Sequence, residues 1–199
     1  MTKVFPNGPS SSCSDATETV LTVWKKSMLL NCEGFTVFNA DGNLVYRVDN
    51  YLADNKGEIL LMDAAGSPLF TIRRKRLSLA DSWVVYEGET GANPRFSARK
   101  QMNLLKSKCL TRVVELAGSW SGKGMCVYEI EGCYGKRCCV VYDEKRRIVA
   151  EIKRKEAAGG LSFGTDVFRL VVQPQIDTTV AMALLILLDQ MFGSSSTTP

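Results

Sequence analysis

The feature that most constrains this chain is an unbroken run of nine apolar residues near its C-terminus, Val180–Leu188. Successive helical residues are about 100° apart, so a helix of this run would be apolar on every face. It would be about 14 Å long, too short for the roughly 30 Å of a bilayer's hydrocarbon core. Asp177 in front suits an N-cap, and Gly193 behind suits a C-cap. We therefore predict a helix over residues 178–192 that is buried in protein on all sides.

The sequence before this run consists mainly of strand-like segments joined by acidic or glycine-containing turns. The strongest hairpin signal is Asp41-Gly42. Residues 111–116 also alternate between polar and apolar and are predicted as a strand. This spacing allows roughly twelve strands between about residues 20 and 173. We predict a mainly β fold, a closed antiparallel β-barrel that encloses the C-terminal helix. The repeated pairs of segments are 35–38 with 44–48, 59–62 with 69–72, 83–86 with 95–98, and 138–142 with 148–152.

Alternation within the second strand of each pair predicts which side chains face the helix. The inward set is Tyr46 and Val48, Phe70 and Ile72, Phe96 and Ala98, and Ala150 and Ile152. The outward set is Arg47, Thr71, Ser97 and Glu151.

Three of these second strands end in a basic run, at residues 73–76, 99–100 and 153–155. If the hairpins are equivalent, the runs lie at corresponding strand ends and form one basic rim. Alternation places Arg73, Arg99 and Lys153 outward, and we expect Arg74, Lys100 and Arg154 to turn outward beyond the strand ends. The alternative is an ordinary solvated barrel exterior. The candidate residues for binding anions or lipid head groups are Arg73, Arg74, Lys75, Arg99, Lys100, Lys153 and Lys155.

The chain contains no histidine, which excludes Ser-His-Asp and Cys-His catalysis and any histidine metal ligand. Nothing in the sequence indicates Lys- or carboxylate-based catalysis, so we predict a protein that is not an enzyme and needs no cofactor. The seven cysteines include Cys126, Cys133, Cys138 and Cys139, but they lack two separated C-x-x-C pairs. Strand alternation also sends Cys138 and Cys139 to opposite faces, so we predict no metal site.

Three segments are expected: a flexible tail over residues 1–19, one barrel domain over 20–193, and a flexible tail over 194–199. The first 18 residues are polar and Ser-rich, without the apolar region of a secretory signal. We expect a monomer in the cytoplasm, with peripheral membrane attachment or a nuclear location as alternatives. No transmembrane segment and no specific nucleic-acid partner is predicted.

Several segments resemble the plant LURP-one-related proteins, which have a tubby-like fold. The resemblance is carried by residues 21–27, 34–39, 48–51, 61–64, 72–75, 150–155 and 182–192. It covers roughly residues 20–193 and implies a twelve-stranded barrel around a hydrophobic C-terminal helix, a fold shared with phospholipid scramblases. It also implies an association with plant basal defence.

Two functional hypotheses follow. The first is a binding module that docks anionic phosphoinositide head groups through the basic rim, as tubby domains do. The second is a protein–protein adaptor in defence signalling, with unknown partners and no lipid binding. Lipid scrambling is a weaker third hypothesis, because the chain lacks a spanning helix and a Pro-rich N-terminal region.

Overall fold

The structure is a computed structural model, and it describes residues 17–26, 34–51, 58–75, 81–101, 108–116, 125–155 and 164–193. The predicted tails at 1–19 and 194–199 lie almost wholly outside these residues. The first strand begins at Thr19. Among the described residues, the last strand is followed by one helix, α1 (Thr178–Phe192).

Twelve strands form the wall of the molecule, as the sequence predicted, and the segment 111–116 lies largely within the eighth of them. They are β1 (Thr19–Trp24), β2 (Gly34–Phe38), β3 (Leu44–Tyr51), β4 (Glu58–Asp63), β5 (Pro68–Arg74), β6 (Ser82–Glu87), β7 (Pro94–Lys100), β8 (Cys109–Glu115), β9 (Cys126–Cys133), β10 (Cys138–Asp143), β11 (Ile148–Arg154) and β12 (Val167–Val172).

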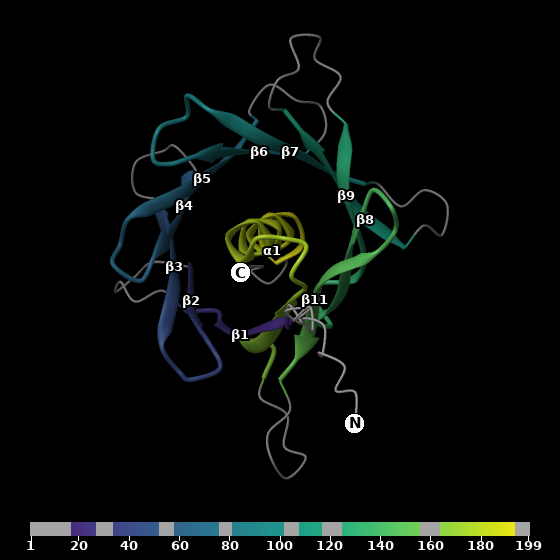
Figure 1. The fold of residues 1–199 in the computed structure, drawn as a ribbon. Helices are drawn as coiled ribbons and strands as arrows, with labels where there is room; N and C mark the ends of the chain where they lie inside the picture. Colours follow the sequence, from purple (N-terminus) through teal and green to yellow (C-terminus); the bar gives the residue numbers. More distant parts are fainter. Residues whose placement is uncertain are drawn as a thin grey trace, which may run out of the picture.

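Each strand pairs antiparallel with its neighbours in sequence, and β1 pairs with β12 to close the barrel. The closing pair runs in regular register from Thr19 opposite Val172 to Trp24 opposite Val167. Closure removes the free sheet edges that would otherwise expose unpaired backbone groups. Figure 1 looks down this ring of strands, with α1 inside it.

The predicted central helix is confirmed. Every residue from Val180 to Leu188 is buried, at 4% exposure or less. Asp177 caps the helix, because its side chain accepts hydrogen bonds from the backbone N–H groups of Thr179 and Val180. Gly193 ends it and donates its own N–H to the carbonyl of Asp189. The helix therefore fills the barrel as its core.

The predicted inward face is also confirmed, since all eight inward residues are buried against the helix or its neighbours. The outward set holds with one difference at Thr71, which is only 1% exposed. The connection between β6 and β7 folds over the outside of β5 at this point. The Thr71 hydroxyl donates to the carbonyl of Gly88 at 2.6 Å, and the N–H of Gly88 donates to Leu69.

The antiparallel order gives the barrel two different ends, which we name after the residues at the two ends of α1. Odd-numbered strands begin at the Asp177 end, where the hydroxyl of Tyr46 on β3 lies 2.6 Å from that of Thr178. They finish at the Asp189 end, where Lys100 of β7 contacts the carbonyl of Met191.

Candidate anion-binding end of the barrel

The three basic runs lie at one end of the barrel, because β5, β7 and β11 all finish at the Asp189 end. They do not form a continuous ring. Only β6 separates β5 from β7, whereas β8, β9 and β10 lie between β7 and β11. The candidate residues therefore fall into a β5–β7 group and a β11 group. Arg76, the last residue of the first run, lies outside the described residues.

In the β5–β7 group, two arginines are already engaged by carboxylates. Arg73 Nε lies 3.1 Å from Glu58 Oε1, and its guanidinium lies over the ring of Tyr86. Arg74 pairs with Asp81. Lys75 and Arg99 are exposed, and neither side chain has an ion pair among the residues that the structure describes.

Lys100 contradicts the prediction that it turns outward. Its Nζ donates to the carbonyl of Met191 at 2.7 Å and lies 4.7 Å from the centroid of the Phe192 ring. The last carbonyls of a helix have no partner within the helix, and the negative end of the helix dipole favours a cation. Lys100 is the next side chain on the inward face after Ala98, so it reaches over the strand end onto the helix terminus. It has a structural role there.

The β11 group includes a residue that sequence reasoning missed, Arg169 on β12. Lys153 stands directly opposite Arg169, and Arg169 stands opposite Thr22 of β1. Lys153 pairs with Glu151 at 2.8 Å, and Lys155 Nζ lies 3.3 Å from the hydroxyl of Thr22. Arg169 alternates with two buried residues of β12, and that alternation is a signal that could have placed it on the outer face.

Arg154 turns away from the barrel interior as predicted. It is exposed, and its Nε donates to the backbone carbonyl of Lys136 in the β9–β10 turn at 2.9 Å.

A buried polar cluster closes this end around Asp189, whose side chain is 10% exposed. Its Oδ1 accepts hydrogen bonds from Lys25 Nζ and from the hydroxyl of Tyr134, both at 3.0 Å. Burial, together with the neighbouring Asp189 carboxylate, raises the pKa of the Tyr134 phenol well above its usual range, so the hydroxyl remains a donor. The guanidinium of Arg137 stacks 4.3 Å from the rings of both Tyr134 and Phe168. The cluster ties β1 and the β9–β10 turn to the helix.

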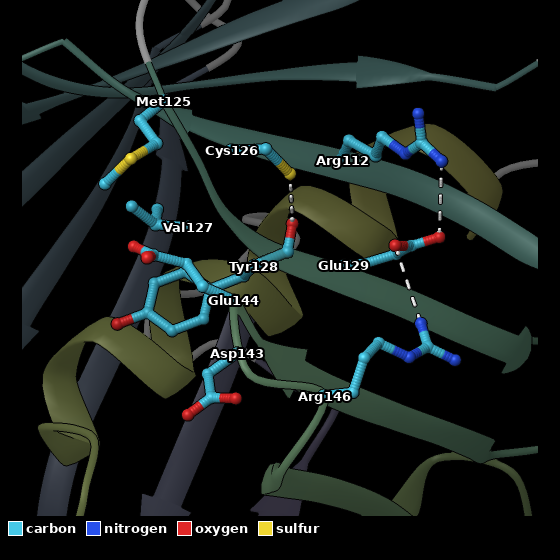
Figure 2. Close-up of a pocket in the computed structure, with 9 residues that line it drawn as sticks. All are labelled: Arg112, Met125, Cys126, Val127, Tyr128, Glu129, Asp143, Glu144 and Arg146. Atoms are coloured by element: carbon cyan, nitrogen blue, oxygen red, sulfur yellow. Dashed lines mark hydrogen bonds and ion pairs between the residues drawn. The ribbon is translucent and has the colours of Figure 1, made fainter.

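A surface groove lies at the other end of the barrel. Its volume is about 360 Å³, and it is lined by residues of β8, of the start of β9 and of the turn between β10 and β11. Figure 2 shows Glu129 between two arginines, Arg112 at 3.6 Å and Arg146 at 3.5 Å. Met125 stands at its rim and is 63% exposed. The charges of the groove are largely paired with one another, so it does not present a net cationic surface.

The cysteines behave as strand alternation predicted, with Cys138 exposed and Cys139 buried. Burial raises the pKa of the Cys139 thiol to about 12. Within the described residues, no three potential ligands of the types His, Cys, Asp and Glu come together as a metal site. Over the same residues, no helix has the length and apolar character needed to cross a membrane.

The fold defines the class of this protein, a β-barrel closed around a hydrophobic C-terminal helix. A family model described as LURP-one-related matches residues 19–189. The chain therefore belongs to the LURP-one-related family, which confirms the resemblance seen in the sequence.

Individual relatives agree with this assignment. The chain is 52% identical to Protein LURP-one-related 8 of Arabidopsis thaliana, over 98% of this chain and 100% of that protein. It is 46% identical to Protein LURP-one-related 17 of the same species, over 88% of this chain and 84% of that protein. An X-ray structure of an Arabidopsis thaliana protein has the same fold, with a TM-score of 0.66 at 21% identity, covering 88% of this chain and 91% of the other.

Proposed function

We propose that this protein is a non-enzymatic binding module that docks on anionic, phosphoinositide-containing membranes through the Asp189 end of its barrel. The observation that carries the proposal is the convergence of exposed cations there. Lys75 directly follows β5, Arg99 lies on β7 and Lys153 on β11, and these three strands finish at the same end. Each basic residue near an anionic membrane contributes about 1 kcal/mol, so useful affinity requires several on one surface.

The proposal places the protein in the cytoplasm at the membrane surface, with a nuclear location as the alternative, and includes a role in plant basal defence. Two observations support a docking role over catalysis. The chain has no histidine, and the polar side chains around Asp189 are engaged in hydrogen bonds that hold the helix in place.

The test is binding to phosphatidylcholine vesicles with and without phosphatidylinositol 4,5-bisphosphate at physiological salt. We expect wild type to sediment only with the phosphoinositide vesicles and to dissociate as salt rises, because surface charges are screened within about 8–10 Å. Reversing the exposed cations Lys75, Arg99 and Lys153 to Glu should abolish binding and change the free energy of unfolding by about 1 kcal/mol or less.

A charge-matched control reverses Lys145, Arg146 and Arg147 to Glu in the β10–β11 hairpin, at the opposite end. This control should bind like wild type, provided that its melting temperature shows it to be folded. Equal loss of binding in both triple variants would mean that net charge alone drives association.

The second candidate is the protein–protein adaptor, which the groove with its exposed Met125 favours. If the wild-type protein does not bind phosphoinositide vesicles even at low salt, the membrane proposal is wrong and the adaptor is favoured.

A further inference from the structure

One aromatic side chain is exposed at the Asp189 end among the residues that the structure describes. Trp24, the last residue of β1, is 41% exposed. The other exposed large apolar side chains among the described residues lie at the Asp177 end, Met125 directly before β9 and Ile148 at the start of β11. Lys26 Nζ lies 5.3 Å from the centroid of the Trp24 ring. A half-exposed indole beside an ammonium group needs an explanation, because burying the ring would remove much apolar surface from water.

The outer face next to Trp24 is basic across three adjacent strands. Thr22, two residues before Trp24 and therefore on the same face of β1, stands opposite Arg169, which stands opposite Lys153. The side chain of Lys155 begins just after β11 and reaches Thr22 on β1, so it spans the intervening β12.

Among the residues that the structure describes, the basic side chains of this face outnumber its carboxylates. Lys153 has Glu151 as a partner, and Asp166 lies exposed just before β12. Arg169 is exposed, and its side chain has no ion pair among the described residues. Like charges directly opposite each other on neighbouring strands repel, and among the described residues Glu151 pairs with Lys153 but not with Arg169, so this face favours a further anion.

We infer that Trp24, Lys26, Lys153, Lys155 and Arg169, here named the Trp24 patch, form the face that contacts an anionic phospholipid bilayer. The inference rests on the proposed function and names the surface that would contact the membrane. The indole lies at the head-group level, where tryptophan is enriched in membrane proteins, and the four cations contact lipid phosphates. The combination of an aromatic ring with cations fits a bilayer surface, which offers an apolar boundary beside its anionic head groups.

The inference is tested with two variants on phosphatidylcholine vesicles containing phosphatidylinositol 4,5-bisphosphate. Trp24→Ala removes the ring and keeps every charge, and it should weaken binding several-fold at all salt concentrations without changing the salt dependence. Lys153→Glu/Arg169→Glu should weaken binding by on the order of tenfold or more and flatten the salt dependence.

Each variant has a matched control at the Asp177 end. Met125→Ala removes an exposed apolar side chain, and Lys145→Glu/Arg147→Glu makes the same change in charge. Both should bind like wild type. Circular dichroism and melting temperature establish that each variant is folded, and Trp24→Phe should restore part of the binding lost in Trp24→Ala.

The outcomes separate this inference from the proposed function. If wild type binds but the two patch variants bind as tightly as wild type, the patch is wrong and the membrane proposal stands. If the charge variant loses binding and Trp24→Ala does not, the surface binds anions without inserting the ring, which also overturns the inference. If wild type does not bind at all, the proposed function itself fails.

Discussion

The two ends of the barrel are stabilised in different ways. At the Asp177 end, turns are closed by their own side chains. Asn39 Oδ1 accepts from the N–H groups of Asp41 and Asn43, Asp63 Oδ1 accepts from Ser67, and Asp143 Oδ1 accepts from Lys145 and Arg147. Partners within these turns are two to four residues apart, as in the turns that Asn and Asp favour. The hydroxyl contact of Tyr46 with Thr178 is a long-range link at the same end.

At the Asp189 end, the partners come from distant parts of the chain. Lys25, Lys100 and Tyr134 are separated by 164, 91 and 55 residues from the helix residues that they contact. The charges at the two ends of α1 also match the helix dipole, since the Asp177 carboxylate caps the positive end and the Lys100 ammonium contacts the negative end. The turns and the helix cap at the Asp177 end are therefore determined by local sequence, whereas these contacts at the Asp189 end form only when the barrel closes.

The helix connects both ends, so breaking it should have the largest effect. Leu185→Asp places an unpaired carboxylate in the core, at a residue 1% exposed, and should cost several kcal/mol of the free energy of unfolding. Removing residues 178–199 should leave an insoluble chain. Denaturant unfolding monitored by circular dichroism checks both, and a truncated protein that is soluble and unfolds cooperatively would contradict the central-helix account.

At the Asp189 end, Asp189→Ala leaves the Tyr134 hydroxyl and the Lys25 ammonium without their acceptor. We expect a loss of about 2–3 kcal/mol, because unsatisfied buried polar groups retain their desolvation cost. Adding Tyr134→Phe should recover part of the loss, since it removes the orphaned hydroxyl. Strictly additive losses in this double-mutant cycle would show that the two side chains are not coupled.

At the Asp177 end, Asp177→Ala should cost about 1 kcal/mol, the usual value of an N-cap. Asp177→Asn keeps an acceptor and is the matched control, expected to lose much less. Chemical denaturation measures both variants, and equal losses would locate the effect in charge near the helix rather than in the capping hydrogen bonds.

The smallest expected effect is a difference in reactivity between two neighbouring thiols. At about pH 8, Cys139 should resist iodoacetamide in the folded protein, because the thiol is buried and its pKa is raised to about 12. Its exposed neighbour Cys138 should be alkylated, as measured by peptide mass spectrometry. Labelling of both at equal rates would mean that the strand is not in the described register.

A related expectation concerns metal. The purified protein should contain no stoichiometric zinc, and its melting temperature should be unchanged by chelator. One equivalent of bound metal by elemental analysis would overturn the prediction that the cysteines bind none.

The sequence was sufficient for features with a local signal, such as the helix with its Asp177 cap and the Asp41-Gly42 hairpin. It failed for Lys100, because only barrel closure brings that side chain to a helix end 91 residues away. Arg169 was missed because it follows no repeated hairpin, and its basic neighbour Lys153 belongs to the adjacent strand. Tertiary placement of charge is thus the part that alternation alone does not specify.

The central claim is that the Asp189 end, and not the Asp177 end, faces an anionic membrane. Exposed cysteines mark both ends, Cys138 at the start of β10 and Cys126 at the start of β9. Two variants that keep one of these exposed thiols, with the remaining accessible cysteines changed to Ser, would carry a fluorophore on phosphoinositide vesicles containing nitroxide-labelled lipid. The account predicts strong quenching of the label at Cys138 and little at Cys126. Equal quenching at both positions, or stronger quenching at Cys126, would contradict it.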